Sequence, residues 1–379
     1  MKQLKIALVH DYLNQYGGGE RVLEALYELY PDATVYTSIY DKKLMESWLK
    51  IPSKKIKTNF ISKLPFNKYL TKHYFFLYPL AFRFQNLEDA DLIISTCSYA
   101  SKFVRGKKGA VHICYLHTVP RFLWGYDTEL SRYYRRWFDR LLAPLYMILV
   151  PLFKAFLKRA DFGAAQKIDY FLTNSLEVQK RIEKHYHRDS TVIYPPVDVE
   201  RFSKTDSSKK ENYYIIISRL GGYKKVDTAV KAFNKLGLRL KIVGEGPQFS
   251  LLKKIAAPNV ELLGRLSDSE VTNLLQNAKA LIFPTFEDFG IVPVEAMAAG
   301  IPVITYAAGG ALETVVDGQT GIFFNKQEPE SIIEAVKKFE TMKINPEDCK
   351  NQAKKFSKKL FKENIINYVG KILKERKLT

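Results

Sequence analysis

Cysteine is scarce in this sequence, which has three among 379 residues, Cys97, Cys114 and Cys349. An odd number of cysteines argues against a disulfide framework, and their spacing is not that of metal ligands. We therefore expect free or buried thiols in a reducing cytosol.

Acidic residues are outnumbered, with 40 Asp and Glu against 59 Lys and Arg, which leaves a net charge of +19 and a pI near 9.5. Such a balance favours polyanions or an anionic membrane surface as partners. A thermophile's lysine-rich surface would have the same composition. No nucleic-acid-binding motif is recognisable, so we do not expect nucleic acid as a partner.

Long apolar runs are missing as well. The opening MKQLKIALVHDY is too short in apolar residues for a signal peptide and leads into a glycine loop, as a first strand should. The apolar stretch 141–157 is interrupted by Pro144, Pro151 and Lys154 and is short for a span of about 20 residues.

Basic and aromatic residues are interleaved in two segments, 55–83 and 132–159. This pattern is typical of a helix that lies in a membrane interface, and it predicts a surface that docks on the inner leaflet of the plasma membrane. A pair of core helices in the N-terminal half is the alternative interpretation, and both can hold.

The remaining sequence has the length for two domains and an apolar fraction of 46%, which supports full cores. Buried-strand patterns alternate with helical patterns such as 227–236 and 269–277, which predicts an α/β fold with two doubly wound parallel sheets. The proline pair that ends the short strand pattern 191–198 predicts a hinge between them. The other predicted strands are 5–9, 91–95, 111–115 and 170–173 in the first half, and 213–218, 238–243, 260–263, 280–283, 302–305 and 321–324 in the second.

Two carboxylates eight residues apart, Glu287 and Glu295, flank a glycine loop after the predicted strand 280–283. We expect the helix after this loop to open at Pro293, which suits a first helical position. Both carboxylates would then face the carboxyl ends of parallel strands, where open α/β sheets bind ligands. The helix start offers N–H groups and a positive dipole to a phosphate, a combination that suits a sugar nucleotide. The residues of this loop and helix start assigned to donor binding are Phe289, Gly290 and Ile291.

A second strand–loop–helix segment carries Arg219 and Lys224 five residues apart on a glycine loop, with Lys225 next to them. A bidentate guanidinium and a point ammonium together fit a diphosphate. In the first half, three glycines (17–19) follow the first strand and could let backbone N–H groups approach an anion. The absence of G-x-G-x-x-G spacing there argues against a dinucleotide site.

These motifs together resemble retaining glycosyltransferases of family 4, and the resemblance extends over most of the chain. It implies the GT-B architecture, with two Rossmann-like domains facing each other across a cleft. Residues 1–195 would form the acceptor-side domain and residues 196–360 the domain that binds the nucleotide-sugar donor. A C-terminal helix within 361–379 would cross back onto the first domain.

The same resemblance implies roles for individual residues of the second half. Arg219 and Lys224 match the family's phosphate-binding pair, and Arg265 lies on a loop that lines the nucleotide pocket. Glu287 would orient the sugar, and Glu295 would hold the ribose hydroxyls.

In the first half, the family's glycine loop corresponds to Gly18 and Gly19. The string Y-x-H-T-x-x-R-x-x-W resembles a bacterial mannosyltransferase subgroup and places a functional histidine at His117. Arg121 and Trp124 would shape the acceptor or sugar pocket, although Trp124 could instead belong to the core. We take His117, Arg219, Lys224 and Glu287 as the catalytic set.

The function that follows is transfer of a hexose, mannose from GDP-mannose, to a saccharide or polyprenyl-linked saccharide in cell-surface polysaccharide synthesis. The protein would be cytoplasmic and peripheral at the membrane. No metal or cofactor is expected, and the D-x-D string at Asp89 and Asp91 looks like ordinary polarity at a strand start. A UDP-sugar donor (glucose, galactose or N-acetylglucosamine), a nucleotide-sugar epimerase or phosphorylase on the same fold, and a non-enzymatic membrane- or nucleic-acid-binding module are the alternatives.

Overall fold

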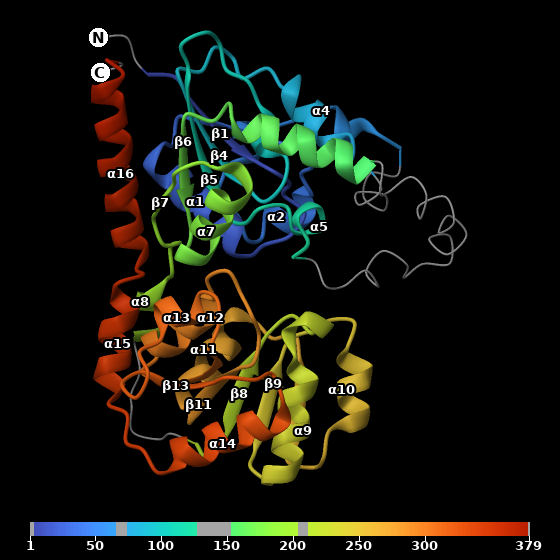
Figure 1. The fold of residues 1–379 in the computed structure, drawn as a ribbon, viewed down its shortest axis with the longest axis vertical. Coiled ribbons are helices and arrows are strands. Elements are labelled where there is room, and N and C mark those ends of the chain that lie inside the picture. The colour runs from blue at the N-terminus through green and yellow to red at the C-terminus, as the bar shows by residue number, and fades with distance from the viewer. Residues whose placement is uncertain (1–3, 66–73, 127–152, 204–210, 378–379) are drawn as a thin grey trace. The chain divides into compact units, whose positions relative to one another are not determined.

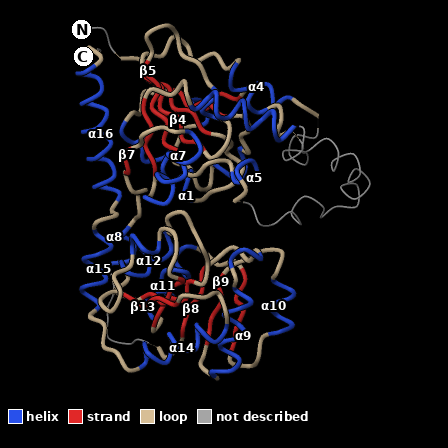
Figure 2. The backbone as a smooth tube through the Cα atoms, in the orientation of Figure 1, coloured by secondary structure: helices blue, strands red, loops and turns tan. Residues whose placement is uncertain are grey.

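Two units, each built on its own parallel sheet, make up the fold (Figure 1). The computed structural model describes residues 4–65, 74–126, 153–203 and 211–377. The first unit comprises Met1–Pro196 and Phe361–Thr379, and the second comprises Val197–Leu360. The strands lie inside each unit with helices around them (Figure 2). The predicted α/β class with two Rossmann-like parallel sheets is confirmed.

The first unit holds a seven-stranded sheet in the order β3-β2-β1-β4-β5-β6-β7. All residues of β4 and β5 are buried, because a parallel sheet is covered on both faces. Its strands are β1 (Ile6–His10), β2 (Thr34–Thr37), β3 (Ile56–Thr58), β4 (Leu92–Cys97), β5 (Val111–Leu116), β6 (Tyr170–Thr173) and β7 (Thr191–Val192). Its helices are α1 (Gly18–Leu29), α2 (Lys42–Met45), α4 (Tyr78–Arg83), α5 (Arg121–Trp124), a helix over 153–165 and α7 (Leu176–Tyr186), with short 3-10 turns at η1 (Ser53–Lys55), η2 (Phe60–Lys63) and η3 (Ser101–Phe103).

The last helix, α16 (Lys358–Glu375), packs on this first unit although the second unit precedes it in the chain. Four side chains at helical spacing enter the core beneath the sheet, Phe361, Ile365, Val369 and Ile372. An ion pair between Lys362 and Glu28 of α1 (2.5 Å) adds a polar contact at the edge of that surface.

The second unit holds a six-stranded sheet in the order β10-β9-β8-β11-β12-β13. Every strand predicted in this half is present, with ends that differ by at most two residues. The strands are β8 (Tyr214–Ile217), β9 (Leu240–Val243), β10 (Val260–Gly264), β11 (Ala280–Phe283), β12 (Val303–Tyr306) and β13 (Gly321–Phe324). The helices are α8 (Val199–Ser203), the 3-10 turn η5 (Gly222–Lys224), α9 (Val226–Leu236), α10 (Phe249–Ile255), α11 (Asp268–Asn277), α12 (Ile291–Ala298), α13 (Ala311–Thr314), α14 (Pro329–Glu340) and α15 (Pro346–Lys354).

Three details differ from the sequence predictions. Helix α12 begins at Ile291 and not at Pro293, because Gly290 takes a left-handed φ of 85° and ends the loop two residues earlier. A proline at the third position is tolerated because N–H groups of the first turn have no partner within the helix. The strand predicted over 191–198 is limited to Thr191–Val192. Strands β2 and β3 were not predicted, since both are short and β3 is an exposed edge strand.

The predicted membrane-facing segments, 55–83 and 132–159, lie partly outside the described residues, which omit 66–73 and 127–152. Within the part that the structure describes, the helices all fall short of the length and apolar character needed to cross a bilayer.

Candidate functional site

In the second unit, the loops that follow β8, β9 and β10 are joined to one another by backbone hydrogen bonds. These bonds run from Ser218 N to Val243 O (3.0 Å), from Leu220 N to Glu245 O (2.9 Å) and from Gly244 N to Gly264 O (2.8 Å). Gly244 has a φ of 137°, and a Cβ there would overlap the Ser218 carbonyl, so the close approach requires glycine. The loops hold Arg219 and Arg265 at the carboxyl edge of the sheet, and both residues are exposed.

Lys224 and Glu287 form an ion pair, although 63 residues separate them in the chain. Lys224 ends the turn η5 after β8, and Glu287 lies on the loop between β11 and α12. Their side chains are 12% and 27% exposed, so the pair is partly shielded from water but accessible to a ligand. The structure therefore brings together one predicted phosphate-binding residue and one predicted sugar-binding residue.

Two glycines hold the Glu287 loop in place. Gly310 N donates to the Glu287 carbonyl (2.9 Å). A Cβ on Gly309 would overlap that carbonyl, and a Cβ on Gly310 would overlap the backbone of Phe289. Because both obstacles are backbone atoms, a larger residue at either glycine would push the Glu287 loop away from its position.

The start of α12 lies directly after this loop, and Gly290 is its N-cap. The Phe289 side chain is buried against Phe356, with ring centroids 5.6 Å apart, so only the backbone of Phe289 is available to a ligand. Glu295 is the fifth residue of the helix and is 6% exposed. It therefore lies two positions further into the helix than a start at Pro293 implies, and it is a buried carboxylate in an otherwise apolar helix.

Lys225 connects the loop that carries Arg219 and Lys224 to the helix that follows it, α9. It is the N-cap of α9 and takes a left-handed φ of 55°, which is unfavourable for a residue with a Cβ. The Lys225 side chain is exposed.

In the first unit, a buried cluster forms at the carboxyl ends of β1, β4 and β5. His10 at the end of β1 contacts Thr96 of β4 through Nδ1 (2.6 Å) and Glu20 of α1 through Nε2 (3.5 Å). The other Glu20 oxygen accepts a hydrogen bond from Gly17 N (2.8 Å), so the carboxylate also caps α1. Burial disfavours the charged carboxylate, but His10 and the backbone outweigh it and keep the pKa of Glu20 below its ordinary value.

His117 joins this cluster directly after β5, where the sequence predicts it. Its backbone is held at both ends, because its N–H donates to the Cys97 carbonyl (2.8 Å) and its carbonyl accepts from Asn174 (3.0 Å). A Cβ on Gly19 would lie 3.4 Å from His117 Nε2 and 3.5 Å from His10 Cε1, so both imidazoles lie against the glycine loop. Gly18 and Gly19 are the first two residues of α1, and their N–H groups are in its first turn.

Sequence reasoning missed three residues of this region: His10, Asp11 and Glu20. Asp11 is buried and accepts four backbone N–H bonds of 2.6–2.8 Å from residues 98–101, which orders the loop after β4. Two features of the sequence could have identified these residues. His10 and Asp11 are polar residues directly after a predicted buried strand, and Glu20 directly follows the three glycines.

Trp124 belongs to a partly buried network. Its indole N–H donates to Asp161 (2.9 Å), and its ring lies 4.5 Å from the His185 ring and 4.4 Å from the Lys158 ammonium. Asp161 also pairs with Lys102 at 2.6 Å, and both side chains are 0% exposed. The structure thus accounts for Trp124 as part of the packing of this unit, whereas its predicted contact with a sugar stays a prediction. Arg121, three residues earlier, is partly exposed.

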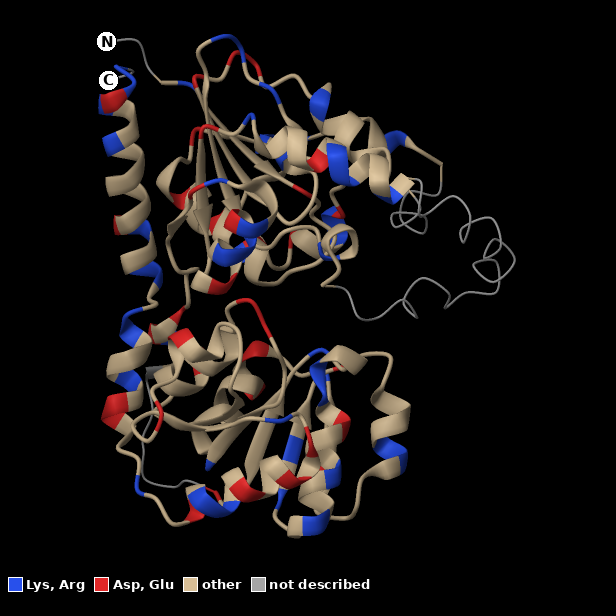
Figure 3. Ribbon diagram, viewed as in Figure 1, with Lys and Arg blue, Asp and Glu red and all other residues tan. Residues whose placement is uncertain are grey.

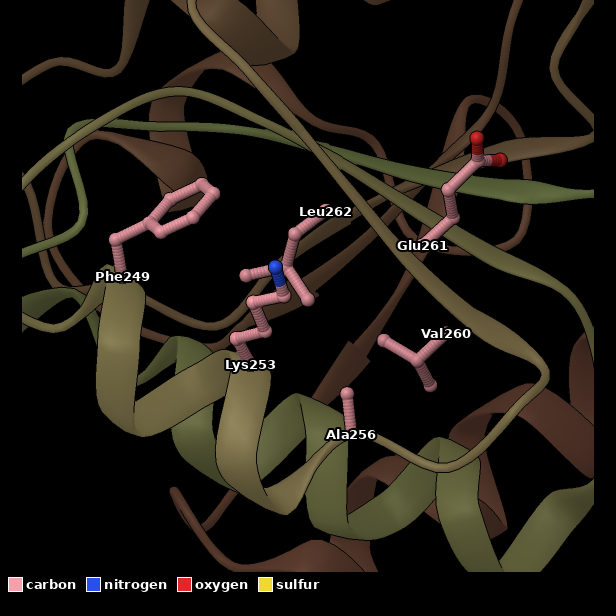
Figure 4. Close-up of a pocket in the computed structure, with 6 residues that line it drawn as sticks. All are labelled: Phe249, Lys253, Ala256, Val260, Glu261 and Leu262. Atoms are coloured by element: carbon pink, nitrogen blue, oxygen red, sulfur yellow. The ribbon is translucent and has the colours of Figure 1, made fainter.

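Among the described residues, no group of three or more His, Cys, Asp or Glu side chains could hold a metal ion. Asp91 of the D-x-D string accepts from Lys5 N (2.9 Å) and pairs with Lys107 (2.6 Å), which accounts for its charge structurally. A hollow of about 310 Å³ between α10 and β10 is lined by Phe249, Lys253, Ala256, Val260, Glu261 and Leu262 (Figure 4). The predicted donor-binding residues do not line this hollow.

Comparison with known proteins gives two family matches. Residues 198–356 match the model of Glycosyl transferases group 1, and residues 16–201 match that of Glycosyltransferase Family 4. An uncharacterized glycosyltransferase of Methanocaldococcus jannaschii is 28% identical over 56% of this chain, and this chain spans 61% of that relative. An alpha-1,3/1,6-mannosyltransferase, ALG2 of Candida glabrata, is 28% identical, with 96% of this chain and 91% of the relative covered. The crystal structure of HepE from Anabaena in complex with UDP shares the fold, with a TM-score of 0.70 at 17% identity, covering 97% of this chain and all of HepE.

Proposed function

We propose that this chain, which belongs to the group 1 and family 4 glycosyltransferases of GT-B fold, transfers mannose from GDP-mannose with retention of anomeric configuration. The acceptor is a saccharide or a polyprenyl-linked saccharide in cell-surface polysaccharide synthesis. The relatives named ALG2 support mannose as the sugar.

The pairing of Lys224 with Glu287 beside the start of α12 carries this proposal. A donor whose diphosphate binds Lys224 and whose hydroxyls bind Glu287 would share or exchange this ion pair. The exposed Arg219, on the same loop as Lys224, adds a bidentate contact to the diphosphate. The N–H groups of Gly290 and Ile291 at the start of α12 add hydrogen bonds and a positive dipole.

We propose a same-face displacement for the chemical step. The acceptor hydroxyl oxygen bonds to the anomeric carbon on the same face from which GDP leaves, so the configuration is retained. The bond between the anomeric carbon and the diphosphate oxygen breaks with its electron pair on GDP, and a phosphate oxygen takes the acceptor proton. Arg219 and Lys224 stabilise the negative charge that develops on the leaving diphosphate.

The remaining predicted residues have supporting roles. Glu287 orients the sugar ring through its hydroxyls, and Glu295 holds the ribose. His117 binds a hydroxyl or supports charge on the ring, beside the glycine loop of Gly18 and Gly19. No metal is required, because the two basic side chains offset the diphosphate charge. We place the reaction in the cytoplasm, at the inner face of the plasma membrane where lipid-linked acceptors are found.

Calorimetric titration with GDP-mannose, GDP and a set of UDP-sugars, in EDTA, tests the donor. Selective binding of the two guanine ligands is expected. Preference for a UDP-sugar would retain the enzyme class but overturn the mannosyl assignment. A lack of binding to every ligand, or binding only after a divalent metal is added, would overturn the donor site as described.

A further inference from the structure

Helix α4 and the turn before it present apolar side chains to solvent. Phe76, Leu80 and Phe84 are 43%, 45% and 71% exposed; Leu80 lies in α4, Phe76 in the turn before it and Phe84 directly after it. The opposite side already fills the core, because Ala81 and Phe82 are 1% and 0% exposed. A surface helix normally turns polar residues outward, so this outer apolar stripe calls for a partner.

The helix over 153–165 continues the apolar surface. Phe153 and Phe156 are 43% and 68% exposed, whereas Leu157 is buried. The ring of Phe153 lies 6.0 Å from that of Phe76, so the two helices contribute to one surface. Figures 1 and 2 show the two helices side by side. We call the five exposed side chains Phe76, Leu80, Phe84, Phe153 and Phe156 the aromatic patch.

The charged side chains in the described segments 74–84 and 153–160 are all basic. Arg83, Lys154, Lys158 and Arg159 are exposed on the same two helices (Figure 3). The segments 74–84 and 153–160 contain no Asp or Glu. An apolar surface flanked by exposed cations matches the interface of an anionic bilayer, where rings enter the acyl boundary and basic groups meet phosphates.

We propose that the aromatic patch docks this protein on an anionic lipid surface. Phe84 and Phe156, the most exposed members, enter the acyl boundary, and the four basic side chains bind lipid phosphates. A second copy of the chain fits less well, since a symmetric contact would place these cations against one another. The proposal does not depend on which nucleotide sugar is the donor, because lipid binding is measured without transfer.

Vesicle co-sedimentation of the full chain tests whether the aromatic side chains bind lipid. The vesicles are phosphatidylcholine with or without phosphatidylglycerol. Combining Phe84→Ser with Phe156→Ser is expected to weaken binding to the anionic vesicles by about tenfold or more, since each substitution removes a large apolar side chain. The matched control combines Leu251→Ser with Leu312→Ser, which are 50% and 57% exposed in the second unit, and it should bind like the wild type. Equal binding of the two double variants, or a wild type that ignores anionic vesicles, would overturn the proposal.

The contribution of the basic side chains is tested with Lys154→Gln and Arg159→Gln. Each substitution is expected to weaken binding to the anionic vesicles about fivefold at low salt. Lys371→Gln on α16, whose side chain is 76% exposed, is the control for a general loss of charge and should have little effect.

A fluorescence experiment distinguishes a loss of lipid binding from poor folding of the variants. Phe156→Trp should be quenched by lipids with brominated acyl chains, whereas Leu312→Trp should not. Unquenched Phe156→Trp would contradict insertion. A wild type that is dimeric in light scattering, becomes monomeric when the aromatic patch is changed and does not bind vesicles would identify a second copy as the partner instead.

Discussion

Replacing Glu287 with glutamine separates the two roles that we propose for the Lys224–Glu287 ion pair, diphosphate binding and sugar binding. The substitution preserves the size of the side chain and leaves the Glu287 backbone, which Gly310 holds, unchanged. It removes the negative charge that faces Lys224 and weakens the acceptor for sugar hydroxyls. We therefore expect sugar transfer and diphosphate binding to respond in opposite directions.

The magnitudes follow from the geometry. A hydrogen bond to a charged group contributes about 1.5–3 kcal/mol, so losing it in the transition state lowers kcat by about 10- to 150-fold. The ion pair is partly exposed, at 12% and 27%, and such a pair is worth at most about 1 kcal/mol. Releasing Lys224 from it should leave the affinity for GDP unchanged or raise it by up to about fivefold.

Calorimetry with GDP and steady-state kinetics with GDP-mannose measure the two effects on the same preparation. Glu347→Gln is the control for the loss of one carboxylate, because Glu347 pairs with Lys350 (2.7 Å) in the same unit and is not a predicted site residue. It should change neither quantity. Parallel losses of GDP affinity and kcat in Glu287→Gln would show that the carboxylate acts only by holding the loop, and the assignment of Glu287 to the sugar would be wrong.

Three further predictions concern the stability of the fold. Burial lowers the pKa of His112 to about 3, so the folded protein keeps the imidazole neutral while the unfolded chain protonates it below pH 6.5. The free energy of unfolding should therefore fall by about 2 kcal/mol between pH 7 and pH 5. His112→Gln should not show this loss when unfolding is measured in urea. Lys225→Gly removes the unfavourable left-handed conformation at the N-cap of α9, so it should raise the melting temperature and stabilise the fold by about 0.5–1 kcal/mol. Lys231→Gly within the same helix is the control and should lower stability by about 1 kcal/mol. A loss of stability in both variants would argue that the backbone of Lys225 is not strained. Asp161→Asn leaves Lys102 buried without its counter-charge and should lower the free energy of unfolding by about 3–5 kcal/mol. Adding Lys102→Met to the Asp161→Asn variant should restore most of that stability. If the double variant is no more stable than Asp161→Asn, the two groups are not coupled.

The strand pattern of the second unit could be predicted because a covered parallel strand must be apolar on both faces. Ala280–Phe283 and Gly321–Phe324 match their predicted ends, and each of the other strands lies within two residues of its prediction. Short or exposed strands lack this signal, which is why Thr34–Thr37 and Ile56–Thr58 were missed. The start of α12 was misplaced because the proline suggested a first position, whereas the conformation of Gly290 decided it.

The sequence by itself determined which chemical groups follow which strands, since glycines, acids and bases come directly after buried runs. This local order placed Arg219, Lys224, Glu287 and His117 at the carboxyl edges of their sheets. Tertiary structure alone decided which of these groups meet. Lys224 pairs with Glu287 across 63 residues, and His10 joins Glu20 and His117 beside the glycine loop. Trp124 is held in a partly buried network and Phe84 is left in solvent for the same reason, because the neighbours of a side chain are set by the packing of distant segments and not by local propensity.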